Sequence, residues 1–285
     1  MPYFNIVAET SENTVVTEYE PVKKRSDSYQ SEAQLEQEFI RLLCEQGYEY
    51  LPIHTEKDLI GNLRKKLEEL NNYQFSDTEW DDFFKNAVAN PNEHIVEKTR
   101  KIQEDNVQVL IRDDGSSKNI TLIDKKNIHN NRLQVINQYK VNAAAGSREG
   151  SLGCVVGTEN GAKYDNRYDV TVLVNGLPLV HIELKRRGVA IREAFNQINR
   201  YQRDSFWAGC GLYEYIQIFV ISNGTNTKYY SNSTRRNAEK EHEKRGASKT
   251  KTSNSFEFTC FWADANNRVI PDLIDFTKTF FAKHT

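Results

Sequence analysis

The segment RYDVTVLVNGLPLVHIELKRR, from Arg167 to Arg187, constrains the fold of this chain more than any other segment. Two β-branched apolar runs flank an Asn-Gly pair, a combination that is a strong short-range signal for a β-hairpin. Because neighbouring residues of a strand face opposite sides of a sheet, alternate residues of both strands share one buried face. That face comprises Val170, Val172, Val174, Val180, Ile182 and Leu184.

The opposite face of the hairpin carries four polar residues, namely Asp169, His181, Glu183 and Lys185. A two-residue loop would set Asp169 opposite Ile182 and mix the two faces. A three-residue loop of Val174 to Gly176, with its glycine in the left-handed conformation, would keep the faces separate. It would pair Asp169 with His181. The pattern of faces therefore favours this bulged turn, or an equivalent bulge elsewhere.

Such a turn brings Glu183 diagonally next to Asp169. Two carboxylates repel each other unless a cation lies between them, and Mg²⁺ prefers oxygen ligands with few protein carboxylates. Lys185, two residues after Glu183 on the same face, would orient an attacking water or stabilise charge on a phosphate. The alternative interpretation is a cluster of surface salt bridges on a half-exposed sheet, where each pair contributes little.

The apolar spacing changes from helical to strand-like along the chain. Helical spacing predicts helices at 31–50, 58–73, 76–88, 93–105, 190–207 and 270–284. Short β-branched runs predict further strands at 107–113, 119–124, 132–141, 215–224, 226–231 and 255–263. Ser31 or Ser28 would cap the first helix, and Ser76 with Glu79 has capping-box spacing.

We therefore expect an α/β domain in which a mixed β-sheet is flanked by α-helices and preceded by an N-terminal helical part. The expected parts are an arm at 1–30 and a domain at 31–285, divided into a helical part at 31–105, a sheet core at 106–230, a charged loop at 232–254, and a C-terminal strand and helix at 255–285. The charged loop holds seven Lys or Arg against three Glu. It would touch DNA or a neighbouring domain, or simply be solvated.

Composition limits the classes of function. A formal net charge of −2 excludes a globally cationic surface, so any nucleic-acid site must be a local basic patch. The four cysteines lack the spacing of a zinc site, and reduced thiols are typical of a cytoplasmic protein. No apolar run approaches the roughly 20 residues of a membrane helix, and no secretion signal is visible at the N-terminus.

The helix predicted after the hairpin adds polar residues near the charged face. Gln197 and Tyr201 are four residues apart and share one side of that helix. Five arginines near it suit a phosphate backbone, with a solvated basic helix face as the alternative. These are Arg186, Arg187, Arg192, Arg200 and Arg203.

These motifs resemble a known nuclease superfamily. Asp169, followed after thirteen residues by Glu-Leu-Lys at 183–185, resembles the PD-(D/E)xK signature, although Tyr168 stands where the motif has proline. QINRY at 197–201 resembles the QxxxY motif of RecB-like nucleases. With NRLQVINQYKV and the hairpin itself, these segments resemble the N-terminal nuclease domain of the restriction (R) subunit of type I restriction-modification enzymes. The resemblance covers most of the chain.

The resemblance implies roles for individual residues. The implied catalytic residues are Asp169, Glu183 and Lys185, and the implied ligands of Mg²⁺, or alternatively Mn²⁺, are Asp169, Glu183 and the backbone carbonyl of Leu184. Gln197, Arg200 and Tyr201 would position DNA or support the catalytic lysine. Members of the family often place a glutamate of an early helix near the metal. Glu36 is a candidate for that glutamate, and Glu32 and Glu38 compete with it.

The resemblance also implies partners, which are double-stranded DNA and the modification (methyltransferase) and specificity subunits of the same system. In the family, the R subunit continues into ATP-driven translocase domains. No GxxxxGK[ST] phosphate loop occurs here, so we expect a fragment in which ATP acts only through absent domains. The alternatives are a stand-alone RecB-like DNA repair nuclease, and a catalytically silent DNA-binding or assembly module.

Overall fold

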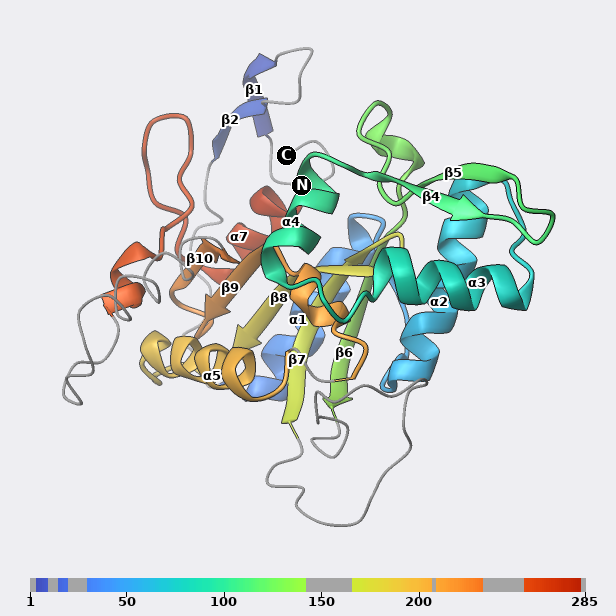
Figure 1. Ribbon diagram of the computed structural model, residues 1–285. Helices are drawn as coiled ribbons and strands as arrows, with labels where there is room; N and C mark the ends of the chain where they lie inside the picture. Colours follow the sequence, from blue (N-terminus) through green and yellow to red (C-terminus); the bar gives the residue numbers. More distant parts are fainter. Residues whose placement is uncertain are drawn as a thin grey trace, which may run out of the picture. The chain divides into compact units, whose positions relative to one another are not determined.

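The computed structural model describes residues 4–9, 15–19, 30–141, 166–206, 209–232 and 254–282. They belong to two compact units, each made of segments that are far apart in the sequence. Unit 1 takes its described residues from 1–48, 182–197 and 218–285, and unit 2 takes them from 49–181 and 198–217. The α/β class and the N-terminal helical part are confirmed (Figure 1). None of the described helices is long and apolar enough to cross a membrane.

Six strands of the described residues form one mixed sheet in the order β10-β9-β8-β7-β6-β3 (Figure 1). Their bounds are β3 Glu49–Tyr50, β6 Leu133–Val141, β7 Asn166–Val174, β8 Leu177–Leu184, β9 Ile218–Ser222 and β10 Thr227–Ser231. β3 is parallel to β6, whereas the pairs β6–β7 and β9–β10 are antiparallel. The sequence predicted all of these strands except β3, which has only two residues.

Two smaller antiparallel sheets complete the strands. They pair β1 Phe4–Glu9 with β2 Val15–Tyr19, and β4 Val107–Ile111 with β5 Ser117–Thr121. The strands β1 and β2 lie within the expected N-terminal arm. Residues 1–3, 10–14 and 20–29 of that arm, and residues 233–253 of the expected charged loop, lie outside the described residues.

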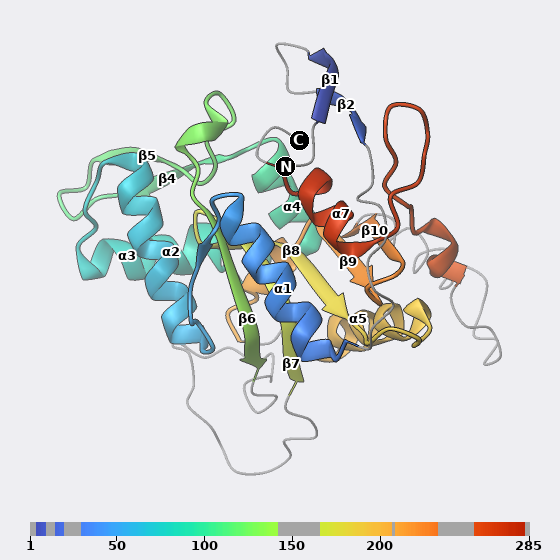
Figure 2. The same ribbon diagram turned by 180° about the vertical axis from the view of Figure 1, so that it is seen from behind.

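Unit 1 holds the helices α1 Glu32–Glu45 and α7 Leu273–Phe280, which lie side by side (Figure 2). Ser31 caps α1 through a capping box with Gln34. The apolar face of α1 packs on the end of the chain, where the rings of Phe39 and Phe281 meet edge to face at 5.6 Å. The Tyr48 hydroxyl donates to the carbonyl of Phe281 at 3.0 Å, so α1 and the C-terminal segment share one buried core.

Unit 2 holds the helices α2 Glu56–Asn71, α3 Asp77–Phe83, the π-helix η1 Phe84–Val88, α4 Ile95–Gln103 and the short 3-10 helix η2 Ile128–Asn130. The capping box of Ser76 with Glu79 is confirmed at the start of α3. α4 docks through Lys98, whose buried ammonium donates to the Gly211 carbonyl at 2.8 Å and to Glu214 at 2.9 Å. Glu214 lies in the 3-10 helix η4, Leu212–Tyr215.

The loop of the central hairpin contains two residues, so the expected three-residue loop is wrong. β7 ends at Val174 and β8 begins at Leu177. Both loop residues have left-handed backbones, with φ of 51° at Asn175 and 85° at Gly176. Such a pair forms a tight turn whose twist matches that of the antiparallel strands it joins.

Packing around the loop explains this turn. The Asn175 side chain is buried, accepts from the backbone N–H of Arg132 at 2.8 Å, and donates to the Leu122 carbonyl at 3.0 Å. A Cβ added to Gly176 would lie 2.6 Å from the Cα of Leu63 in α2. The Asn-Gly pair is therefore selected both by its backbone and by its neighbours.

β7 departs from regular alternation close to the first acidic residue of the hairpin. The rings of Tyr213 and Tyr168 lie 4.6 Å apart, yet the Tyr213 hydroxyl is also 3.3 Å from the hydroxyl of Thr171. Residues three apart on a regular strand face opposite sides. Gln138 of β6, across from this point, has a left-handed backbone with φ of 53°. An irregularity away from the loop therefore lies in the segment that contains Asp169.

The strand predicted at 255–263 is wrong. Residues Asn254–Phe258 form the 3-10 helix η5, and the rest of the segment makes two isolated bridges, from Cys260 to Tyr229 of β10 and from Ala263 to Val269. The Phe256 ring packs edge to face on Phe195 at 5.4 Å, whereas Phe258 is 53% exposed. The alternating aromatic residues thus dock individually and do not form one face of a strand.

Candidate active site

The second strand of the hairpin ends in a buried ion pair within unit 1. Glu183 has no exposed surface, and its carboxylate lies 3.1 Å from the ammonium of Lys185, which is 13% exposed. The backbone N–H of Lys185 donates to the carbonyl of Ser222 in β9 at 2.8 Å, which fixes the position of the lysine. A buried carboxylate needs a cation or hydrogen bonds, and here Lys185 supplies a cation.

Helix α1 of the same unit reaches this region with its acidic first turns. The Glu32 carboxylate accepts from the backbone N–H of Arg186 at 3.2 Å, next to the lysine of the ion pair. Glu36 lies one helical turn later on the same side and is only 8% exposed. Glu38 instead accepts from the Gln30 side chain at 3.0 Å. Among the three candidate glutamates, burial and helix face therefore favour Glu36.

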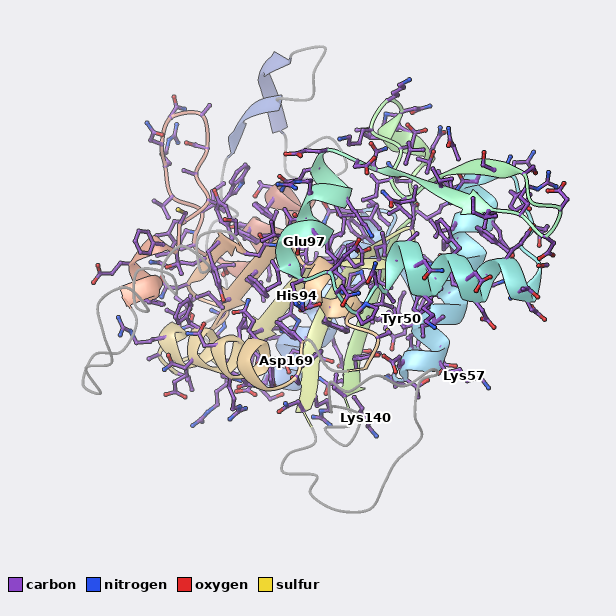
Figure 3. The ribbon with its side chains drawn as sticks, in the orientation of Figure 1. Tyr50, Lys57, His94, Glu97, Lys140 and Asp169 are labelled. Carbon is purple, nitrogen blue, oxygen red and sulfur yellow. The ribbon has the colours of Figure 1, made fainter. Side chains whose placement is uncertain are left out.

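In unit 2, Asp169 lies half-buried on β7, where Figure 3 labels it. Its charge acts on His181 of β8, a side chain with no exposed surface. Burial lowers the pKa of His181 to about 4, against the opposing pull of the Asp169 carboxylate. The imidazole is therefore neutral at physiological pH.

Aromatic rings enclose His181. Its ring centroid lies 5.4 Å from that of Tyr168, 5.5 Å from that of Phe206 and 6.2 Å from that of Tyr201. The strand pattern predicted His181 as part of a charged face and gave no sign of this enclosure. Phe206 and Tyr201 come from helix α5, Ile191–Asp204, and the turn after it, which no pattern within the hairpin reports.

Tyr201 is a buried support for β7. It is 2% exposed, and its hydroxyl donates to the carbonyl of Arg167 at 2.9 Å, two residues before Asp169. Its ring lies 4.8 Å from that of Tyr168, which is fully buried and shares a hydrogen bond of 2.7 Å with Ser205. The position of the motif's proline is thus occupied by a core aromatic residue.

The other predicted polar residues of the helix have different surroundings. Gln197 is half-buried on the part of α5 that belongs to unit 1. Arg200 is exposed in unit 2, with its guanidinium 5.6 Å from the centre of the Tyr201 ring. Arg187 is held within unit 1, by Gln30 at 3.1 Å among others. The side chain of Arg203 lies outside the described residues.

The predicted metal ligands are oxygen donors. Among the described residues, no group of three or more His, Cys, Asp or Glu side chains is arranged to hold a metal ion. The predicted set of ligands contains only two such side chains, the carboxylates of Asp169 and Glu183, and its third ligand is the backbone carbonyl of Leu184. A fully buried carboxylate such as Glu183 fits a hard divalent cation, whose charge offsets the burial of the anion.

The family model described as the type I restriction enzyme R protein N terminus matches residues 29–238 of this chain. The chain belongs to this family. The resemblance to the N-terminal domain of type I restriction enzyme R subunits is therefore confirmed.

The type I relatives extend the match over nearly the whole chain. The EcoprrI endonuclease subunit of Escherichia coli is 45% identical over 280 residues, which cover 98% of this chain and 79% of that subunit. The SsaAORF53P endonuclease subunit of Staphylococcus saprophyticus is 35% identical over 257 residues, covering 88% of this chain. The chain spans 23% of that longer protein. A putative MjaIXP subunit of Methanocaldococcus jannaschii is 31% identical over 129 residues, covering 44% of this chain and 11% of that subunit.

Proposed function

We propose that this chain is the Mg²⁺-dependent endonuclease domain of a type I restriction enzyme R subunit, which hydrolyses phosphodiester bonds of double-stranded DNA. Family membership and the similarity to endonuclease subunits of type I restriction enzymes support the reaction class. The observation that carries the proposal is the buried Glu183 carboxylate, held 3.1 Å from the Lys185 ammonium. A carboxylate beside a lysine at a strand end suits metal-assisted hydrolysis.

The carboxylates of Asp169 and Glu183 and the carbonyl of Leu184 would hold the Mg²⁺, and the same donors suit Mn²⁺. When bound, the ion supplies Lewis-acid stabilisation of negative charge on the phosphodiester. Glu36, buried on α1 of the unit that contains Glu183, is the candidate for an additional carboxylate near the ion.

Lys185 orients the attacking water and balances the charge that develops on the phosphate. Its side chain is mostly buried, and its backbone N–H donates to the carbonyl of Ser222. This hydrogen bond fixes the backbone from which the side chain extends. Tyr201 has a structural role, because its hydroxyl donates to the carbonyl of Arg167 in the strand that carries Asp169. Gln197 and the exposed Arg200 would position the DNA.

In the intact enzyme, ATP-driven translocation by further domains of the longer subunit would deliver DNA to this domain. The modification and specificity subunits of the same system would be its partners, and a cytoplasmic location fits a DNA substrate. ATP would act only through those further domains. The isolated chain is therefore expected to cut weakly and without sequence preference.

The proposal is tested by incubating supercoiled plasmid DNA with the chain at high concentration, in Mg²⁺ or in EDTA. We expect Mg²⁺-dependent nicking that falls about 100-fold in Glu183→Gln and in Lys185→Gln. Two variants with matched charge changes at exposed positions, Glu45→Gln and Lys126→Gln, should cut like the wild type.

Cutting that persists in EDTA or in Glu183→Gln would contradict the proposed chemistry. A wild-type chain that binds DNA but never cuts it would favour a catalytically silent module. Complete, sequence-specific cutting without ATP would contradict the dependence on further domains.

A further inference from the structure

Two basic side chains face each other across the strands that precede Asp169. Lys140 of β6 and Arg167 of β7 are direct partners in the antiparallel register, so they project from the same side of the sheet. The next pair, Tyr139 with Tyr168, is buried on the other side and stacked with ring centroids 6.2 Å apart. The alternation therefore turns Lys140 and Arg167 away from the core.

Lys140 and Arg167 form a pair of like charges across the two strands. Both side chains are exposed, and neither makes an ion pair or a side-chain hydrogen bond within the described part of the chain. Like charges directly opposite each other on antiparallel strands repel and destabilise the sheet. An anion that contacts both side chains would remove the repulsion, and a phosphate group has the charge and size for this contact.

A third cation, Lys57, lies three residues after the residue whose carbonyl accepts a hydrogen bond from Lys140. The backbone N–H of Lys140 donates to the carbonyl of His54 at 3.2 Å, which ties the end of β6 to the start of α2. Lys57 is exposed in the first turn of α2, and Figure 3 labels it with Lys140 and Asp169 in the lower part of the view.

The acids next to Lys57 are engaged elsewhere. Asp58 accepts from the Thr55 hydroxyl at 2.6 Å, and Glu56 accepts from the backbone N–H of Cys210 at 2.6 Å. We call Lys57, Lys140 and Arg167 the cationic edge.

The cationic edge lies close to the proposed metal ligand. Arg167 precedes Asp169 by two residues on β7, a separation of roughly 7 Å along a strand. The carbonyl of Arg167 accepts the hydrogen bond of the buried Tyr201 hydroxyl, which fixes the backbone at this point. A phosphate held by Arg167 would therefore belong to a nucleotide adjacent to the one at Asp169.

We propose that the cationic edge binds the DNA backbone, at a phosphate next to the one that is cut. The inference rests on the proposed function, because it assumes that the substrate is DNA. It adds a binding contact that the PD-(D/E)xK and QxxxY motifs do not contain. The contact is with a phosphate and carries no preference for base sequence.

The test is the salt dependence of binding to a fluorescein-labelled duplex of 30 base pairs, measured by anisotropy in EDTA so that nothing is cut. The variant Lys140→Gln/Arg167→Gln removes the cross-strand pair. The matched control, Lys126→Gln/Arg132→Gln, removes the same two kinds of charge just before β6 begins, at the opposite end of that strand.

For Lys140→Gln/Arg167→Gln we expect the slope of log K against log salt to decrease in magnitude by roughly 2, and affinity near 0.1 M salt to fall on the order of tenfold or more. The control should keep the wild-type slope. Thermal unfolding should show the cationic-edge variant to be at least as stable as the wild type, because a repulsion has been removed.

Equal slopes for the wild type and the cationic-edge variant, or equal losses in the variant and its control, would overturn the proposal. So would a wild-type chain that does not bind the duplex. Cleavage in Mg²⁺ and its loss in Glu183→Gln report on the proposed nuclease function separately. The cationic edge can therefore fail as a DNA contact while the nuclease assignment stands.

Discussion

Glutamate usually lies at the protein surface, but Glu183 is fully buried. A carboxylate without exposed surface loses several kcal/mol of hydration, and one lysine at 3.1 Å offsets part of this loss. The sequence predicted the acid and the lysine on one face from their spacing of two. It did not predict the depth of burial, because the residues that cover β8 come from distant segments.

His181 shows the same limit of sequence reasoning. Its position in the alternation predicted a polar neighbour of Asp169, and the charge of Asp169 does act on it. The structure adds that the imidazole is neutral and enclosed by rings, since burial lowers its pKa to about 4. Two of those rings, Tyr201 and Phe206, come from α5 and the turn after it, so only the tertiary structure reveals the enclosure.

The buried side chain of Tyr48 predicts a pH dependence of the stability of the folded chain. Burial raises the pKa of Tyr48 to about 12, against 10 for the exposed side chain of the unfolded chain. The stability that Tyr48 contributes is therefore fully present below pH 10. It is lost between pH 10 and 12, because the unfolded chain releases the proton first, and the loss is about 2–3 kcal/mol.

Urea unfolding of the wild type and of Tyr48→Phe between pH 8 and 12 measures this loss. At pH 8 the variant should be less stable by about 1 kcal/mol, because the hydrogen bond to the Phe281 carbonyl is gone. The variant should then become relatively more stable as the pH rises. Parallel curves over the whole range would show that the Tyr48 pKa is not raised.

At the scale of elements, the N-terminal helices were predicted well because their signals are local. Ser31 and Ser76 cap α1 and α3, and the apolar positions of α1 point into the core. The strand predicted at 255–263 is wrong because the segment has the apolar period of a strand but makes too few backbone bridges to form one. Within this segment only Cys260 makes a backbone bridge to β10, and Phe256 packs on α5.

The hairpin loop offers a prediction about how elements pack. Gly176→Ala should destabilise the chain by about 3 kcal/mol, because the residue has a φ of +85° and its Cβ would lie 2.6 Å from the Leu63 Cα in α2. Gly61→Ala is the matched control, since nothing lies within 4 Å of its Cβ and alanine favours helix. It should stabilise α2 by about 0.5–1 kcal/mol.

Urea unfolding of both alanine variants at neutral pH measures these changes. Equal stability of Gly176→Ala and the wild type would mean that α2 does not pack against the turn in this way. A destabilised Gly61→Ala would show that the open space around that residue is filled.

At the scale of the whole molecule, the order of strands and helices predicted a mixed α/β fold, and the six-stranded mixed sheet confirms it. The division into two units was not predicted, because β8 and α5 each contribute residues to both. Periodicity reports where an element begins and ends. It does not report that one strand serves two cores.

The central claim is that Asp169 and Glu183 bind one divalent ion. Calorimetric titration of the chain with Mn²⁺ tests it most directly, using Asp169→Asn, Glu183→Gln and the double variant, with Glu45→Gln as the control. The account predicts one site per chain, weakened at least about tenfold by either single change, and a double variant little weaker than the singles because the residues share one ion. Mn²⁺ affinity that is unchanged in both single variants would contradict the claim.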